Sequence, residues 1–384
     1  MGIAVEGRYV QNVANMRVCG RMGMSDGRQY SQNAANASRC ECMGIAVEGR
    51  YIQNVANAGC CVRMGTVGGV RSRGRSLIVS WSMCFEVSEV ATSYSGVMVE
   101  TFTVRNIDNE TSSAMVSDYG AHVLKWAPKG QQAVVWCPNA IYLIEGKAVR
   151  GGVPIIFPWF NSGFENGHVA SKKPKHGFAR VSFWKFDAAG STQSKLRYEM
   201  DSSQVDESIL AQFVSGPNPR FHAVYEISAK ESLTMSLTVT NDGAEPLAYE
   251  AALHTYLHVA DVERAQVLGL EHASYLDTTL DGDPLCESDG EPVSFNGLVD
   301  RIYYSEDTLE VKDDVLGRTL VIAKEGSEQT VVWNPGEKNG NAIGDLQEGE
   351  WRDFVCVEAV ANRDRSINIA AGESHTLSQT ISVK

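Results

Sequence analysis

The sequence lacks the features of several common protein classes. No apolar run reaches the length of about 18 residues that a membrane-spanning helix needs, and no charged start leads into a short apolar core, as in a secretory signal. The 34 basic residues are outnumbered by 47 acidic ones, giving a net charge of −13. A nucleic-acid surface needs clustered Lys and Arg, so we expect neither nucleic acid nor a membrane as a partner, and a cytoplasmic location. A small anionic ligand stays compatible with this composition, because it experiences only the local field.

Motifs for hydrolytic and zinc chemistry are also absent. The chain contains neither G-x-S-x-G nor H-E-x-x-H, so serine-hydrolase and zincin chemistry have no motif. Its nine cysteines are odd in number, which argues against a secreted disulfide scaffold. The cysteines at Cys40, Cys42, Cys60 and Cys61 lack zinc-ribbon spacing and have no nearby histidine. We therefore predict no metal site.

The beginning of the chain differs in composition from the rest. Residues 1–80 hold ten Arg, no Lys and four acidic residues, and Met1–Asn15 returns almost unchanged as Met43–Asn57. Two copies are too few for a solenoid. Three interpretations stay open: a disordered tail, upstream sequence joined to the reading frame with the true start near Met83 or Met98, and an organellar transit peptide. None of them gives this segment chemistry.

The pattern after about Val97 is typical of β-structure. In Leu233–Thr240, aliphatic residues alternate with threonine and serine, the period of a half-buried strand, and Asn241–Gly243 then supplies a turn. Many similar short runs follow, separated by turn-forming residues. We therefore predict a single all-β catalytic domain over residues 97–384, folded as a large antiparallel β-sandwich, after an N-terminal extension of residues 1–96.

Two residues in strand-like runs are candidates for acid–base chemistry. On a strand, His254, Tyr256 and His258 would share one face, and an imidazole there could exchange a proton near neutral pH. Glu358 is the sole charge within the apolar run Phe354–Val360, and partial burial would raise its pKa toward that of a general base. The alternatives are structural histidines with satisfied hydrogen bonds, and a glutamate at a strand edge or paired with an arginine.

Basic residues and one aspartate suggest ligand contacts. Arg150 precedes a Gly-Gly pair, which lets backbone N–H groups approach a ligand, and Lys175 and Arg180 belong to a basic segment over residues 171–180. The forked donors of arginine suit phosphate. Asp300 could accept hydrogen bonds from two adjacent sugar hydroxyls. A solvated basic loop and an internal ion pair are the corresponding structural explanations.

Taken together, these segments resemble the aldose 1-epimerase family, and within it the hexose-6-phosphate 1-epimerases. The resemblance extends over about three quarters of the chain and is carried, in order, by Tyr119–Val123 with Trp126, Arg150–Pro154, Phe157–Phe160, His176–Arg180, Leu253–Leu257, Asp300–Tyr303, Val332–Pro335 and Cys356–Glu358.

The resemblance implies a fold, a reaction and roles for individual residues. The fold would be the large antiparallel sandwich of the galactose mutarotase type, and the reaction would need no metal, nucleotide or other cofactor. Glu358 would act as base and His254 as acid, and Asp300 would bind the sugar. The implied partner is a small sugar phosphate, and we expect a monomer.

The basic residues favour a phosphorylated sugar over an unphosphorylated one as the substrate. The resemblance matches Arg150 and Arg180 to binding sites for the 6-phosphate, and Lys175 stands before His-Gly where the family often has Gln. Rival interpretations are an epimerase for unphosphorylated aldoses, a non-catalytic carbohydrate-binding module, and a glycoside hydrolase, which would need a second carboxylate.

Overall fold

The structure, a computed structural model, describes residues 102–216 and 218–384. Of the earlier residues it describes only the backbone of five short strands, β1 (Gly2–Val5), β2 (Arg8–Val10), β3 (Ala46–Val47), β4 (Arg50–Tyr51) and β5 (Val87–Val90). The predicted extension, residues 1–96, otherwise lies outside the described residues. Its interpretation therefore stays a prediction.

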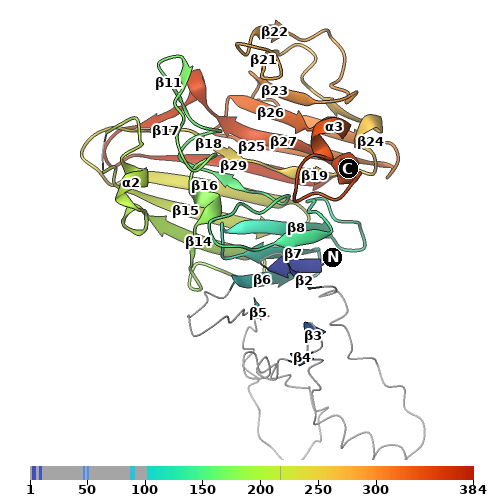
Figure 1. Cartoon of the computed structure of the whole chain (residues 1–384), viewed down its shortest axis with the longest axis horizontal. Helices are drawn as coiled ribbons and strands as arrows, with labels where there is room; N and C mark the ends of the chain where they lie inside the picture. Colours follow the sequence, from blue (N-terminus) through green and yellow to red (C-terminus); the bar gives the residue numbers. More distant parts are fainter. Residues whose placement is uncertain are drawn as a thin grey trace, which may run out of the picture.

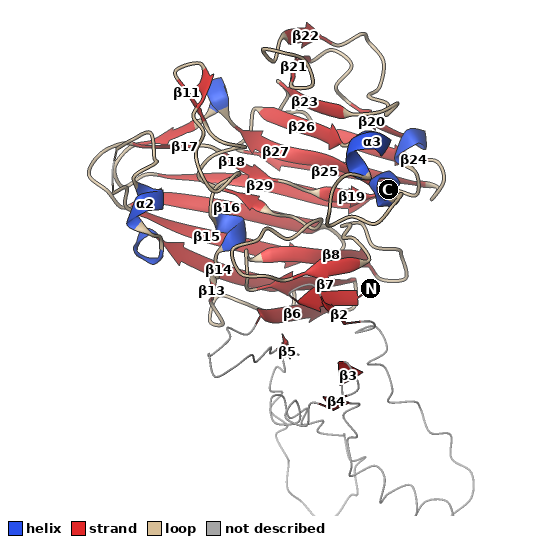
Figure 2. Ribbon diagram, in the orientation of Figure 1, coloured by secondary structure: helices blue, strands red, loops and turns tan. Residues whose placement is uncertain are grey.

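Strands dominate the described part of the chain, with only a few short helices between them (Figure 2). The strands are β6 (Phe102–Asp108), β7 (Ser112–Ser117), β8 (His122–Pro128), β9 (Ala140–Tyr142), β10 (Ile155–Ile156), β11 (Phe164–Glu165), β12 (His168–Val169), β13 (Lys185–Phe186), β14 (Lys195–Asp201), β15 (Phe221–Ala229), β16 (Leu233–Asn241), β17 (Leu247–Tyr249), β18 (Ala251–Leu253), β19 (Tyr256–His258), β20 (Ala265–Leu268), β21 (Ser274–Asp277), β22 (Leu285–Glu287), β23 (Val299–Tyr303), β24 (Leu309–Asp313), β25 (Arg318–Glu325), β26 (Gln329–Asn334), β27 (Phe354–Ala361), β28 (Ile367–Ile369) and β29 (Ser374–Val383). The α-helices are α2 (Glu207–Leu210) and α3 (Gly336–Gly340), and none of the described helices is long and apolar enough to cross a membrane.

Two eight-stranded sheets form the body of the molecule (Figure 1). The site sheet has the order β10-β18-β27-β26-β23-β21-β22, with β19 also paired to β27. The supporting sheet has the order β13-β14-β15-β16-β29-β25-β24-β20. Every strand pair within both sheets is antiparallel, which confirms the predicted all-β antiparallel architecture.

The alternating sequence pattern decides which side chains enter the core between the sheets. Along β16 the aliphatic residues are buried and the intervening threonines and serine are half-buried, as predicted for Leu233–Thr240. On β27, Val355, Val357 and Ala359 pack into the same core, and the strand contacts β25 and β29 of the supporting sheet. Successive side chains on a strand point to opposite faces, so the intervening residues of β27 face away from this core. That outer face of the site sheet carries the functional groups.

Candidate active site

A cavity of about 450 Å³ opens on the outer face of the site sheet. The structure brings all of the predicted site residues to its wall, namely His254, Glu358, Arg150, Lys175, Arg180 and Asp300. Their sequence positions span more than half of the chain, so the fold alone brings them together.

His254 occupies an irregular position between two short strands. β18 ends at Leu253 and β19 begins at Tyr256, and both pair with β27. The backbone N–H of His254 donates to the carbonyl of Pro154 at 3.1 Å, which continues the pairing of β18 with β10, while Thr255 N–H turns back to Leu253. The imidazole stacks on the Tyr256 ring with centroids 5.0 Å apart and planes 9° from parallel. His254 and Tyr256 therefore lie on the same face of the strand, and both line the cavity.

His258, which the sequence pattern grouped with His254, does not line this cavity. Its imidazole and backbone carbonyl lie against the Arg318 guanidinium. The predicted shared face holds for His254 and Tyr256, because β18 and β19 pair with β27 in one continuous register and both side chains line the cavity. His258 is two residues further along the strand and lies outside the cavity.

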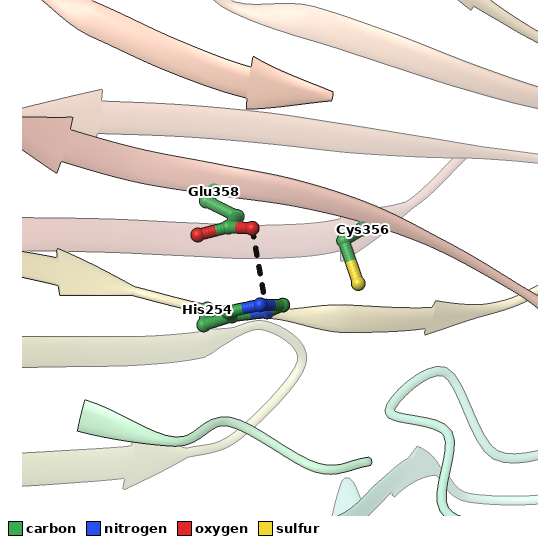
Figure 3. Close-up of side chains that lie close together, drawn as sticks. All are labelled: His254, Cys356 and Glu358. Carbon is green, nitrogen blue, oxygen red and sulfur yellow. Dashed lines mark ion pairs between the residues drawn. The ribbon is translucent and has the colours of Figure 1, made fainter. Parts of the chain in front are cut away.

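Glu358 lies directly opposite His254 on the central strand β27 (Figure 3). Its side chain is 1% exposed, and its Oε1 is 3.3 Å from Nδ1 of the imidazole. Neither that Nδ1 nor Glu358 Oε2 has a hydrogen-bond partner among the described residues. Buried polar atoms are normally paired, so these two atoms are available to a ligand.

The cavity shifts the proton affinities of this pair in opposite directions. Burial, with a contribution from Asp300, raises the pKa of Glu358 well above its usual range, although Arg180 opposes the shift. Burial, assisted by Arg180 and Arg150, lowers the pKa of His254 to about 3. Both shifts favour the neutral forms, an imidazole and a protonated carboxyl, which together carry one titratable proton.

A residue from the supporting sheet connects the two segments that carry this pair. Gln379 on β29 is fully buried, and its amide donates to the carbonyl of Val357 at 3.0 Å while its carbonyl accepts from the Thr255 hydroxyl. Thr255 follows His254 in the chain and Val357 precedes Glu358. The sequence analysis missed this contact. The sequence signal that could have indicated it is the position of Gln379, a polar residue that alternates in phase with the buried Leu377 and Ile381.

Two arginines form a cationic end of the cavity. Arg150 donates from Nε to Asp345 and from a terminal nitrogen to the Tyr256 hydroxyl, each at 3.0 Å. Arg180 donates to the carbonyl of Lys175 at 2.7 Å, whereas its buried Nε has no described partner. Burial lowers the pKa of Arg180 to about 10, so the guanidinium stays charged at neutral pH. An anionic group would satisfy the free donor and compensate both charges.

The Gly-Gly pair after Arg150 has a structural role and not the predicted role in ligand binding. Gly151 and Gly152 both have positive φ, and a Cβ on Gly152 would collide with the His122 imidazole and the carbonyl of Val123. Neither glycine lines the cavity. The pair therefore permits close packing behind the site, and does not bring backbone N–H groups to a ligand as we had predicted.

Asp300 forms another part of the wall, on β23 beside β26. Burial raises the pKa of Asp300, and a hydrogen bond from the side chain of Thr278 partly opposes this. Glu250, which the sequence analysis did not single out, also lines the cavity, but its carboxylate accepts from the backbone of Phe160 and Arg363, each at 2.8 Å. The carboxylate of Glu250 is thus occupied by the backbone of the rim, whereas that of Asp300 lies in the cavity wall, where it can accept from a polar ligand.

The sandwich and this cavity define a sugar-acting isomerase with the mutarotase fold. The chain belongs to the aldose 1-epimerase family, whose profile matches residues 103–382.

Relatives agree in sequence and in structure. A Salmonella typhimurium protein provisionally named glucose-6-phosphate 1-epimerase is 30% identical over 264 residues, covering 66% of this chain and 81% of the relative. An Escherichia coli K12 protein with the same provisional name is 29% identical over 265 residues, with coverages of 66% and 81%. A Salmonella typhimurium crystal structure, provisionally described as a mutarotase, superimposes with a TM-score of 0.64 at 27% identity, covering 73% of this chain and 90% of that one. Galactose 1-epimerase from Lactobacillus acidophilus, at 13% identity, a TM-score of 0.57 and coverages of 78% and 99%, shares the fold.

Proposed function

We propose that this enzyme interconverts the α and β anomers of an aldohexose 6-phosphate, with glucose 6-phosphate as the first substrate to test. The observation that carries the proposal is the buried pair of His254 and Glu358, 3.3 Å apart, in a cavity whose wall also holds Arg150 and Arg180. Family membership supports the reaction, and the names of the relatives support the phosphorylated substrate.

The reaction requires one acid and one base that exchange roles. Glu358 as carboxylate removes the proton of the C1 hydroxyl, and His254 as imidazolium protonates the ring oxygen. The bond between C1 and that oxygen breaks, giving the open-chain aldehyde. Rotation about the C1–C2 bond presents the other carbonyl face, and the reverse transfers close the ring with inverted configuration at C1. The pair keeps its single proton throughout, so no cofactor is needed for this proton balance.

Substrate binding adjusts the pair to this task. In the empty site the charges of Arg180 and Arg150 disfavour the imidazolium of His254. A phosphate dianion beside these arginines offsets their charge, so it raises the pKa of His254 and shifts the shared proton from Glu358 to the imidazole. The unphosphorylated sugar does not supply this charge, which makes the phosphate a contributor to catalysis as well as to affinity.

Other polar groups of the wall support binding of the same substrate. The free Nε of Arg180 and the fork of Arg150 suit the phosphate, and Lys175 adds a third positive charge. Asp300 is placed to accept from sugar hydroxyls. The monomeric state and the cytoplasmic location stay predictions.

The decisive assay follows freshly dissolved α-glucose 6-phosphate to its anomeric equilibrium by polarimetry, corrected for the spontaneous reaction. The wild type should accelerate this approach, and Glu358→Gln, which keeps the shape but removes the base, should lose at least a thousandfold in kcat. Exchanging Arg150 and Arg180 together for Ala should raise KM for glucose 6-phosphate at least tenfold and leave KM for glucose nearly unchanged. Absence of acceleration by the wild type with either sugar would refute the proposal, and an unchanged KM in the double variant would refute the phosphate assignment.

A further inference from the structure

The catalytic pair has a neighbour that the proposed reaction does not use. Cys356 lies on β27 two residues before Glu358, so both side chains leave the strand on the same face. The thiol is fully buried, and it adjoins His254 and Glu358 without taking part in the wall of the cavity (Figure 3). One nitrogen of His254, the Cys356 sulfur and one carboxylate oxygen of Glu358 all lie within 4.8 Å of one another.

These three donors form a ligand set that suits Zn²⁺. Imidazole nitrogen, thiolate sulfur and carboxylate oxygen are its usual ligands, in a tetrahedral arrangement. Nitrogen and oxygen ligands at about 2.0 Å from a tetrahedral centre lie about 3.3 Å from each other. Nδ1 of His254 and Oε1 of Glu358 already have a separation of 3.3 Å. The Cys356 sulfur, within 4.8 Å of both atoms, would supply the third ligand, and the cavity leaves the fourth position open to water or a sugar hydroxyl.

The hydrogen-bonding state of the cluster also indicates room for a ligand. Nδ1 of His254 and Oε2 of Glu358 have no hydrogen-bond partner among the described residues, and only 1% of the Glu358 side chain is exposed. The positive charges of Arg150 and Arg180 oppose a cation here. A thiolate and a carboxylate together compensate the two charges of the metal, so the cluster itself stays close to neutral.

We propose that His254, Cys356 and Glu358 form an inhibitory site for Zn²⁺, in which the bound ion occupies the acid and the base and blocks sugar turnover. The inhibition rests on the proposed function, whereas binding of the ion does not. Metal binding and substrate conversion exclude each other, because each requires the same two side chains.

The test uses the full chain with Cys356→Ala and, as the matched control, Cys286→Ala, which removes a thiol of β22 that lies outside the cavity. Cobalt(II) serves as a spectroscopic probe, because a thiolate ligand gives a charge-transfer band in the near ultraviolet. Equilibrium dialysis against ZnCl₂ then counts bound ions. The wild type and the control should bind one more ion than Cys356→Ala, and only this variant should lack the additional cobalt–thiolate absorbance.

The kinetic arm measures the half-inhibitory Zn²⁺ concentration in the anomerisation assay. We expect it to rise at least tenfold in Cys356→Ala, to stay unchanged in Cys286→Ala, and inhibition of the wild type to be reversed by EDTA. Cys356→Ser provides a second variant if alanine impairs folding. Equal metal stoichiometry and equal cobalt spectra in wild type and Cys356→Ala would overturn the proposed site. This outcome would also result if other cysteines of the chain bind the ion. If the enzyme shows no anomerase activity, dialysis and the cobalt spectrum still decide the metal site separately.

Discussion

Replacing Gln379 by Leu should damage catalysis from the opposite side of the sheet. The substitution keeps the volume and the burial but removes both hydrogen bonds that link Thr255 and Val357. A buried polar group left without its partner costs about 1–3 kcal/mol. The Thr255 hydroxyl has a weaker alternative acceptor, the carbonyl of Leu253 at 3.4 Å, so we expect a total loss of about 2–4 kcal/mol in the free energy of unfolding.

The same change should reduce kcat about tenfold and alter KM little, because it loosens His254 relative to Glu358 without touching the residues that bind the sugar. Anomerisation kinetics at saturating glucose 6-phosphate measure kcat, and urea unfolding measures stability. Thr255→Val, which removes the donor of one of these hydrogen bonds, should show a smaller loss of the same kind.

Leu377→Ala is the matched control for a purely structural effect. Leu377 lies on the same strand as Gln379 and faces the same core, and truncating a buried leucine costs about 2–5 kcal/mol. This variant should lose as much stability as Gln379→Leu and keep its kcat. If both variants lose kcat equally, or if Gln379→Leu keeps full kcat, the positioning role of Gln379 is refuted.

Three further predictions concern protonation and packing. The His254 imidazole, with a pKa of about 3, should show no titration between pH 5 and 8 by NMR in the free enzyme. Inorganic phosphate should raise this pKa. Ordinary titration near pH 6.5 without ligand would contradict the electrostatic argument. Burial, with the charges of Glu350 and Asp261, raises the pKa of Asp353 to about 6, so the ionised form of Asp353 destabilises the fold. The variant Asp353→Asn should therefore be more stable than wild type above pH 6, and the difference should vanish toward pH 4. Urea unfolding midpoints measured across this pH range test the sign. Gly152→Ala should cost about 3 kcal/mol or more because its Cβ meets His122, whereas Gly146→Ala, with similar φ but nothing nearby, should cost about 1–2 kcal/mol, as thermal unfolding will show.

The local sequence pattern was sufficient to predict the strands and the burial of Glu358. The alternation in β16 needs only neighbouring residues, and the turn after it is closed by the Asn241 side chain, which accepts from the N–H of Gly243 at 2.9 Å. A single charge in an apolar run predicted a buried glutamate, and Glu358 is 1% exposed.

The features that the sequence could not provide depend on distant partners. The irregular backbone at His254 needs the carbonyl of Pro154, and the orientation of Arg150 needs Asp345, 195 positions away. A periodic pattern carries no information on which remote groups meet.

Strand β27 is hydrogen-bonded on both sides, and every one of its residues is buried. Its amides should therefore exchange with solvent deuterium only when the whole domain opens, whereas the peripheral hairpin of β11 and β12 can open by itself. Glu358 thus belongs to the slowest-exchanging part of the protein. Heating should accordingly abolish activity and native structure in one step, with no intermediate that is folded but has lost the proposed base Glu358. Adaptation to other sugars would then involve the exposed loops beside the cavity, which can vary in sequence without disturbing the strand that carries the proposed base.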